Sequence, residues 1–300
     1  MSQKRKGLNF LKMAKIGIIL SGAASKGAYE YGFLKAIDHF FQKDEIKCVS
    51  SASIGMLASQ TYGIGKPYEF ERIWKMIDPK KHGRLFLSYG GKGPIRDEIC
   101  KVFEKDHKPF FEHYVAIWNF TKSKVEYIPF HELTAEQMQQ YIKGAIAIPI
   151  LTSGEIINGD RILDGAFVDN IPAYPLMEKD LDYILCIYFD NHKYFFENEA
   201  FDSKILKFYD FPNDKRLETL VFTPETFDEM AQYGYDYTLK VLNEVFKSDN
   251  KDEILAAIKH NNDLQDAEYK PRLTVDVVLN KINVMTRKYA KRMSNWEKTD

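Results

Sequence analysis

Two successive strand–turn–helix units occupy residues 16–62 and constrain the fold more than any other part of the chain. Residues 16–20 (IGIIL) and 46–50 (IKCVS) are short apolar runs, typical of strands that are buried on both faces of a parallel sheet. Each run leads into a turn of small residues and then into apolar residues at helical spacing, over 31–40 and 54–62. This alternation predicts right-handed βαβ units and an α/β fold with a mainly parallel sheet.

The turn after the first strand, Ser21–Tyr29, is made mostly of small residues and precedes a helix. That geometry directs several backbone amides and the positive end of a helix dipole at one point, which predicts an anion site. A dinucleotide fingerprint would need glycine where Ala24 stands, and a P-loop would need lysine after Gly27, where Ala28 stands. Two interpretations remain open: an oxyanion hole to which Ala23 and Ala24 supply amides, and a loop kept small for packing.

The turn after the second strand, Ser51–Gly55 (SASIG), places a serine between a strand and a helix. A serine at such a sharp turn exposes its hydroxyl at the edge of the sheet, with a backbone amide behind it that can face developing negative charge. The usual spelling of the turn is G-x-S-x-G. Here Gly55 fills the second glycine position, whereas Ser51 fills the first. Ser53 at the apex is the candidate nucleophile, although serine-rich turns are also common in proteins without any chemistry.

A candidate base follows further along the chain. The Asn158–Gly159 pair between two apolar runs predicts a hairpin, and its second arm ends at Asp164 and Gly165. An aspartate at a strand end can be an ordinary turn residue, but a partly desolvated one can also accept the proton of a serine without a histidine relay. Functional residues gather at the carboxyl ends of parallel strands. We therefore expect the 22–27 loop, Ser53 and Asp164 to converge.

Taken together, these segments resemble the three signatures of the patatin-like phospholipases. The matching segments are Leu20–Tyr29, Ser51–Gly55, Asp164–Ala166 with Asp169–Pro172, and the proline-containing Ala147–Ile150. They cover about residues 15–190, in the order and spacing of the family. The resemblance implies a three-layer α/β/α sandwich with a mainly parallel central sheet. It also implies hydrolysis of acyl ester bonds in lipids through an acyl-enzyme.

Carried over residue by residue, the resemblance implies a Ser–Asp dyad. Ser53 corresponds to the nucleophile and Asp164 to the base, and the amides around Gly22, Ala23 and Ala24 correspond to the oxyanion hole. The motif positions that support these residues are Lys26, Gly27, Gly55 and Gly165.

Two departures from the family pattern affect the expected rate. The glycine-rich loop of the family usually reads G-G-G or G-x-G, but here it reads Gly22–Ala24 (GAA), and Ser51 replaces a glycine. Alanine does not readily adopt positive φ, and losing one oxyanion donor slows turnover by about 10²–10³-fold. A non-catalytic or weakly active lipid-binding protein is therefore an alternative. A Ser-His-Asp hydrolase is another, and it would require His192 or His260 in the pocket.

Composition sets the expectations for partners and compartment. The net charge of −1 argues against a nucleic-acid partner. No apolar run approaches the ~20 residues that span a bilayer, and the basic N-terminus has no apolar segment of a signal peptide. Three widely spaced cysteines (Cys48, Cys100, Cys186) are expected to be buried thiols in a reducing compartment. We therefore expect a cytoplasmic protein.

The resemblance adds a lipid substrate and hence transient, peripheral contact with a membrane surface, for which Phe195 and Phe196 are candidate aromatic side chains. No acidic loop has calcium-ligand spacing, so we expect no metal and no cofactor. Nothing in the sequence specifies an oligomeric state or a lipid head group.

The domain expectation is a single patatin-like domain over residues 1–300. Its recognisable catalytic core covers about 15–190, and residues 191–300 form a mainly helical extension packed on that core. In this extension we predict helices from Thr223 and over 252–260, a strand over 273–279 and a terminal helix over 287–298.

Overall fold

The structure is a computed structural model that describes residues 14–77, 94–105, 108–149, 152–190, 192–209, 211–212, 223–264 and 268–272. The predicted strand over 273–279 and the predicted helix over 287–298 lie outside these residues.

Within the described residues, the two apolar runs of the sequence form the centre of an eight-stranded sheet of order β5-β6-β3-β2-β1-β7-β9, with β4 paired to β3. Neighbours among β1, β2, β3, β7 and β9 are parallel, whereas the β3–β4, β3–β6 and β5–β6 pairs are antiparallel. Every residue of β1 is buried, as expected of a strand covered on both faces. The strands span Ile16–Leu20 (β1), Ile46–Ala52 (β2), Glu112–Asn119 (β3), Lys124–Pro129 (β4), Glu155–Ile157 (β5), Asp160–Asp164 (β6), Tyr183–Ile187 (β7) and Ile205–Phe208 (β9).

Strand β3 brings two distant parts of the chain end to end. Strand β4 pairs with β3 over residues 114–119, so β2 and β6 must share the opposite edge. There β2 ends with Ala52 opposite Ala116, and the antiparallel β6 ends with Asp164 opposite Ile117. The carboxyl ends of β2 and β6 therefore meet head to head along one edge of β3.

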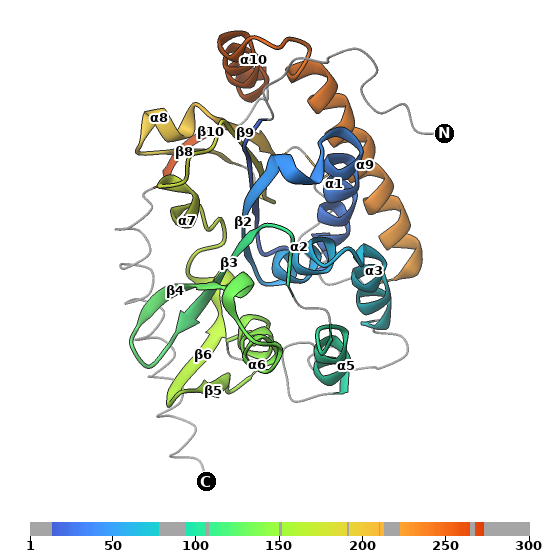
Figure 1. Ribbon diagram of the computed structural model, residues 1–300, viewed down its shortest axis with the longest axis vertical. Helices are drawn as coiled ribbons and strands as arrows, with labels where there is room; N and C mark the ends of the chain where they lie inside the picture. Colours follow the sequence, from blue (N-terminus) through green and yellow to red (C-terminus); the bar gives the residue numbers. More distant parts are fainter. Residues whose placement is uncertain are drawn as a thin grey trace.

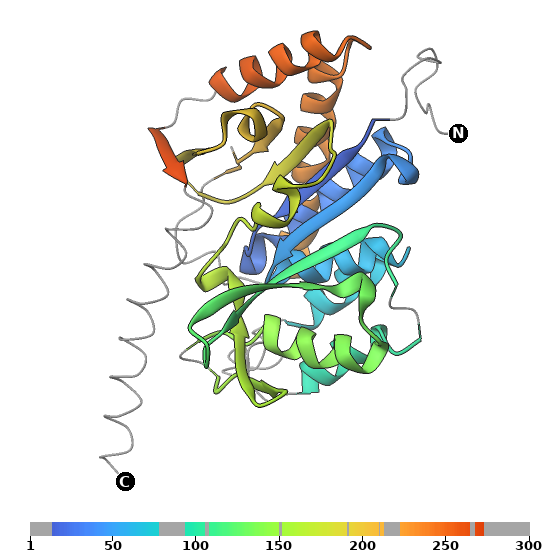
Figure 2. The same ribbon diagram turned by 60° about the vertical axis from the view of Figure 1, so that its left-hand side comes forward.

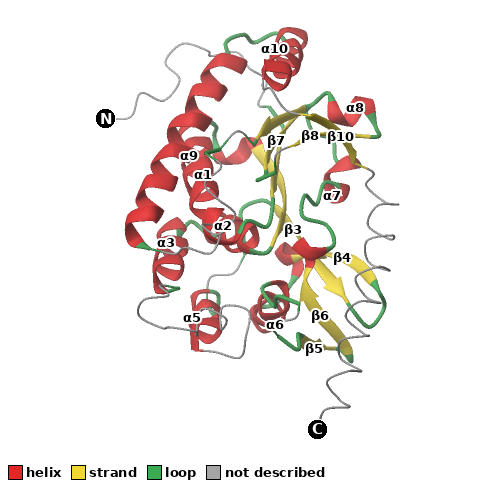
Figure 3. Cartoon of the chain, turned by 180° about the vertical axis from the view of Figure 1, so that it is seen from behind, coloured by secondary structure: helices red, strands yellow, loops and turns green. Residues whose placement is uncertain are grey.

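One face of the sheet is covered by a thick helical layer (Figures 1 and 3). One apolar cluster joins these helices to strands such as β1 and β9. Thr134 begins one of these helices with a capping box, because Thr134 Oγ1 accepts from the Gln137 amide and Gln137 Oε1 accepts from the Thr134 amide. The helices span Gly27–Phe40 (α1), Ile54–Gly63 (α2), Pro67–Met76 (α3), Pro94–Val102 (α5), Ala135–Ala145 (α6), Pro224–Val245 (α9) and Lys251–Leu264 (α10). Helix α10 lies at one end of the molecule and the β5–β6 hairpin at the other (Figures 1 and 2).

The other face carries a thinner layer. It consists of the four-residue helices α7 (Tyr174–Met177) and α8 (Glu199–Asp202) and a small parallel pair, β8 (His192–Phe196) with β10 (Glu268–Arg272). A second apolar cluster, including Ile19 and Cys186, fills the space beneath. The predicted three-layer α/β/α class is confirmed, and the two outer layers differ strongly in thickness.

The two strand–turn–helix units and the hairpin that ends at Asp164 are confirmed as β1–α1, β2–α2 and β5–β6, whereas helix α3 and the three strands β8, β9 and β10 were not predicted. Strand β9 (ILKF) extends the central sheet beyond residue 190. Its short apolar run is broken by Lys207, whose charge is neutralised by a buried ion pair with Asp202 at 2.9 Å. The division into a core and an extension stays a prediction.

Three smaller expectations can be checked directly. The cysteines Cys48, Cys100 and Cys186 are buried and free, as predicted. Phe195 is 39 % exposed, but Phe196 is buried at 3 %, so the expectation of an exposed Phe196 is wrong. The two side chains alternate across β8, and Phe196 packs beneath that strand instead.

In the part of the chain that the structure describes, no helix combines the length and the apolar character needed to cross a membrane.

Candidate active site

Ser53 stands at the turn between β2 and α2. Its backbone has φ 53° and ψ −125°, and its side chain is held at the sheet edge with the residue only 8 % exposed. This left-handed conformation is costly for a residue other than glycine and persists only where the surroundings enforce it. Gly55 allows the required close packing, because a Cβ there would lie 2.7 Å from the carbonyl oxygen of Ser21. The turn therefore has the sharp strand-to-helix geometry predicted from its sequence.

Asp164 faces Ser53 from the end of β6. The Ser53 hydroxyl donates a hydrogen bond to Asp164 Oδ2 over 2.6 Å, and Asp164 Oδ1 accepts from the Ala166 amide over 2.9 Å. Within the described residues, these are the side-chain hydrogen bonds of the pair. Asp164 is only 1 % exposed, and this burial raises the pKa of its carboxyl to about 7 despite the two hydrogen bonds. A carboxylate with such a pKa can accept a proton near neutral pH.

The route by which Asp164 reaches Ser53 differs from the expectation. We expected both residues at the carboxyl ends of parallel strands, but β6 runs antiparallel to β3 and approaches from the opposite direction. Gly165 makes the turn possible, since a Cβ there would lie 2.3 Å from the carbonyl oxygen of Ala116 in β3. The three segments converge as predicted, through head-to-head strands rather than through a shared parallel edge.

The 22–27 loop closes over the dyad. A Cβ on Gly22 would lie 2.4 Å from the Ala166 Cβ and 3.1 Å from the Ser53 Cβ, so only glycine fits between the segments that carry Asp164 and Ser53. The Gly22 amide donates to Asn170 Oδ1 over 2.9 Å, so it already has a hydrogen-bond acceptor. Among the described residues, no hydrogen-bond acceptor is present for the amides of Ala23 and Ala24. Of the three amides expected to form an oxyanion hole, two therefore carry no bond.

Ala24 adopts a positive φ, the conformation that alanine does not readily adopt. Its φ is 49°, whereas Ala23 has φ −140°, so the loop imposes the left-handed conformation at one alanine only. Ala24 bears that strain at the position where the G-G-G or G-x-G pattern has glycine. The remaining motif positions lie nearby: Lys26 is half-buried with its Nζ 5.8 Å from the Phe189 ring centroid, and a Cβ on Gly27 would lie 2.6 Å from Ile54 Cγ1.

A second acidic residue anchors the segment that follows Asp164. Asp169 Oδ1 accepts from Arg272 Nη2 and its Oδ2 from the Tyr127 hydroxyl, each over 2.6 Å. Asn170, next in the chain, holds the Gly22 amide. The sequence predicted no role for Asn170, although its segment belongs to the motif. Arg272 could not be predicted either, because the residues around β10 show no apolar alternation that would indicate a strand.

The histidines proposed for a Ser-His-Asp alternative lie elsewhere. His192 Nδ1 is hydrogen-bonded with Asp190 over 2.8 Å, and His260 is exposed on α10. His113 was not singled out from the sequence, yet it is completely buried on β3 and hydrogen-bonded to Ser51. Neither Ser53 nor Asp164 is bonded to a histidine in the described part of the chain.

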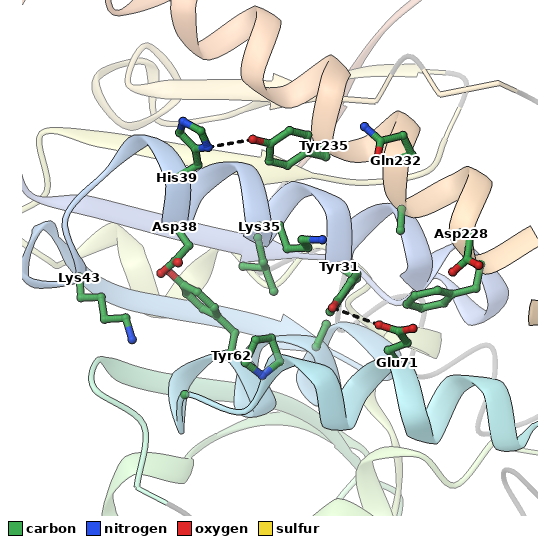
Figure 4. Close-up of a pocket in the computed structure, with 16 residues that line it drawn as sticks. Tyr31, Lys35, Asp38, His39, Lys43, Tyr62, Glu71, Asp228, Gln232 and Tyr235 are labelled. Carbon is green, nitrogen blue, oxygen red and sulfur yellow. Dashed lines mark hydrogen bonds between the residues drawn. The ribbon is translucent and has the colours of Figure 1, made fainter. Parts of the chain in front are cut away.

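One small cavity borders this site, and larger cavities lie elsewhere in the described part of the chain. A cavity of about 100 Å³ borders the site, since Ala166 and Asn170, which contact Gly22, line it together with Arg272. A larger cavity of about 820 Å³ lies among α1, α2, α3 and α9 (Figure 4). Its polar side chains are largely satisfied by one another, as in the Tyr31–Glu71 and His39–Tyr235 hydrogen bonds.

Two curated proteins are similar in sequence to part of this chain. Lysophospholipase NTE1 of Cryptococcus neoformans var. neoformans serotype D is 24% identical over 190 residues, a match that covers 58% of this chain and 11% of that protein. Lysophospholipase NTE1 of Kluyveromyces lactis is 22% identical over 200 residues, covering 60% of this chain and 13% of that protein. The chain thus spans about a tenth of the length of the curated relatives it matches.

Two solved structures are also similar. VipD from Legionella pneumophila matches with a TM-score of 0.46 at 14% identity, over 84% of this chain and 74% of that one. The type III effector protein ExoU matches with a TM-score of 0.39 at 11% identity, over 95% of this chain and 62% of that one. The family model of the patatin-like phospholipases matches residues 18–177, which is more than half of the chain and includes Ser53 and Asp164. The chain therefore belongs to the patatin-like phospholipase family.

Proposed function

We propose that this chain is a serine hydrolase that cleaves acyl ester bonds of lipids, with Ser53 as nucleophile and Asp164 as general base. The observation that carries the proposal is the 2.6 Å hydrogen bond from the Ser53 hydroxyl to Asp164 Oδ2, made between buried side chains from two strands that meet head to head. Nucleophile and base within hydrogen-bond reach are the geometric requirement for covalent catalysis.

The chemistry proceeds in two halves. As Ser53 Oγ attacks the ester carbonyl, its proton moves to Asp164, and the carbonyl oxygen becomes an oxyanion. The amides of Ala23 and Ala24 are the proposed donors to that oxyanion, and the positive end of the α2 dipole adds positive potential beside Ser53. Collapse expels the alcohol, which takes the proton from Asp164 and leaves an acyl-Ser53. Water then attacks the acyl carbonyl and gives its proton to Asp164. The bond between Ser53 Oγ and the acyl carbon breaks, Ser53 Oγ takes the proton back from Asp164, and the fatty acid leaves.

Burial supplies the basicity that this mechanism requires. A solvated aspartate with a pKa near 4 is a weak base for a hydroxyl. Burial raises the pKa of Asp164 to about 7, so the ionised form is both present at neutral pH and more willing to accept a proton. No histidine relay is needed when the carboxylate contacts the nucleophile directly.

Lysophospholipids are the first substrate class to test, because both curated relatives are lysophospholipases. The segment after Asp164 presents Phe167 at 36 % exposure and Tyr174 at 46 %. Exposed aromatic side chains beside the dyad could contact the acyl chains of a membrane surface during substrate entry. Transient membrane contact is part of the proposal.

The dyad predicts the outcome of ester hydrolysis assays. Ser53→Ala and Asp164→Asn should each lower turnover of p-nitrophenyl butyrate and of lysophosphatidylcholine by at least about 10²-fold, because nucleophile and base are then missing. His192→Ala is the matched control and should retain wild-type turnover. Turnover that survives in Ser53→Ala, or is lost in a folded His192→Ala, would refute the dyad. A wild-type chain that binds lipid vesicles and hydrolyses neither ester would support the lipid-binding alternative.

A further inference from the structure

Ser51, which replaces the first glycine of the nucleophile motif, belongs to a buried polar network behind Ser53. Its Oγ lies 2.8 Å from Nε2 of His113, and the Oγ of Ser59 lies 2.9 Å from the same nitrogen. Gln60 Oε1 lies 2.7 Å from Nδ1 of His113. Ser51, Ser59, Gln60 and His113 are each completely buried. We call these four side chains the elbow network.

The hydrogen-bond directions in the elbow network follow from its chemistry. Gln60 Oε1 can only accept, so the proton of His113 sits on Nδ1 and is donated to it. Nε2 is then an acceptor, and Ser51 donates to it. Ser59 lies 2.8 Å from the carbonyl oxygen of Gly55 and can direct its own proton there. Burial, with the nearby charge of His131 adding to it, lowers the pKa of His113 to about 3, so the ring stays neutral.

The elbow network joins the three elements that define the position of the nucleophile. Ser51 lies two residues before Ser53 on β2, Ser59 and Gln60 lie on α2, and His113 lies on β3, the strand that also holds Asp164 through β6. Ser53 itself has a strained backbone that must be held by its surroundings. A set of bonds linking β2, α2 and β3 is placed to do this.

We propose that Ser51 and His113 are positioning residues, whose hydrogen bond fixes the β2–α2 turn so that the Ser53 hydroxyl stays aligned with Asp164. This inference rests on the proposed function, since it takes Ser53 as the nucleophile. The hydroxyl of Ser51 then helps to align the site in this chain. Removing this hydroxyl breaks the bond between β2 and Nε2 of His113, leaves only the Ser59 contact from α2 at that nitrogen among the described residues, and loosens the turn.

The test compares rates at which a fluorophosphonate probe labels Ser53. Ser51→Ala and His113→Phe should each label about tenfold more slowly than wild type, because small misplacements of a reacting atom are costly. Both should lower kcat for p-nitrophenyl butyrate with little change in KM. His113→Gln keeps a donor and an acceptor and should recover most of the rate. Because the two residues act through one bond, Ser51→Ala/His113→Phe should be no slower than His113→Phe.

Ser50 provides the matched control. Its hydroxyl is equally buried on the same strand but has no hydrogen-bond partner among the described residues, so Ser50→Ala should label at the wild-type rate. All rates are taken below the melting temperature of each variant. Equal labelling of Ser51→Ala and Ser50→Ala would overturn the inference, even if Ser51→Ala melts earlier, because the network would then serve stability alone. Should His113→Phe fail to fold, Ser51→Ala decides. Failure of the proposed function is distinguishable, because wild type itself would then remain unlabelled.

Discussion

Ala24 holds a backbone conformation that L-amino acids rarely adopt, in the loop whose Gly22 packs against the proposed nucleophile. Its φ of 49° would cost glycine nothing, while alanine in the left-handed region is disfavoured by about 1–2 kcal/mol. The neighbouring Ala23, with φ −140°, carries no such strain. The two alanines therefore look alike in sequence but differ in what a glycine would do at each position.

Replacing each alanine with glycine should change stability in opposite directions. Ala24→Gly should raise the free energy of unfolding by about 1 kcal/mol, because the strain is removed. Ala23→Gly should lower it by about 0.5–1 kcal/mol, because only the unfolded chain gains freedom. Urea denaturation of both variants and wild type measures this. A destabilised Ala24→Gly would show that the left-handed conformation at this position costs nothing.

The carboxyl of Asp164 predicts the pH dependence of activity. A base must be ionised, and burial raises the pKa of Asp164 from 3.8 to about 7. The value of kcat/KM should therefore increase about tenfold per pH unit below that pKa and become constant above it. Assays with p-nitrophenyl butyrate from about pH 5 to about pH 9 test this.

Two comparisons separate this carboxyl from an imidazole. The profile should persist unchanged in His192→Ala, and His113, with its pKa lowered to about 3, does not titrate in the range. Activity that stays flat down to about pH 5 would contradict a buried Asp164 as base.

The way the strands and turns are connected explains which parts of the site could be predicted from the sequence. The small-residue turns at 22–27 and 51–55 are local, so their strand–turn–helix form could be predicted from the sequence. The pairing of β6 with β3 joins residues more than 40 positions apart and reverses the approach of Asp164. No local pattern encodes that direction, because antiparallel and parallel returns share the same alternation.

The packing of α9 on α1 is the closest helix contact that supports the site. A Cβ on Gly234 would lie 2.4 Å from the carbonyl oxygen of Tyr29, and one on Gly32 would lie 2.0 Å from that of Ala231. Both obstacles are backbone atoms, so they cannot rotate away. Helix α1 follows directly on the 22–27 loop, and a shift of α1 would be transmitted to that loop.

This contact predicts that replacing a helix glycine with alanine lowers the stability of the protein, the opposite of the usual effect. Alanine in place of a helix glycine normally stabilises by up to about 1 kcal/mol. Gly234→Ala should instead destabilise by about 1–3 kcal/mol, because the helices must separate. Thermal denaturation measures the effect, with the exposed Glu229→Ala on the same helix as control, expected within about 0.5 kcal/mol of wild type. A stabilised Gly234→Ala would mean that α1 and α9 are not in close contact.

At the scale of the whole molecule, the sequence predicted the core better than the remainder. Strands buried on both faces appear in the sequence as continuous runs of apolar residues. The positions of β1 and β2 could be predicted from these runs alone. Strands β8 and β10 carry charged residues, among them the buried Lys193 and the ion-paired Arg272, and apolar and polar residues do not alternate along their sequences. Their stabilisation comes from partners distant in the chain, such as Asp169, which composition cannot reveal.

The same reasoning applies to the residues around the dyad. Ser53 and Asp164 could be proposed because each sits in a recognisable turn. Asn170, His113 and Ser51 act through hydrogen bonds to other segments, so their contributions emerge only when the strands are assembled. The replacement of glycine by serine at position 51 appeared from the sequence as a loss, whereas the structure gives its hydroxyl a buried partner.

The central claim is that Ser53, activated by Asp164, forms a covalent intermediate. It is tested most directly by intact-mass spectrometry of the protein after treatment with a fluorophosphonate probe, followed by peptide mapping. Wild type should gain one probe adduct, located on Ser53. Asp164→Asn should label at least about 10²-fold more slowly, and Ser53→Ala not at all. An adduct on Ser53→Ala formed at the wild-type rate, or a wild-type chain that gains none, would contradict the account.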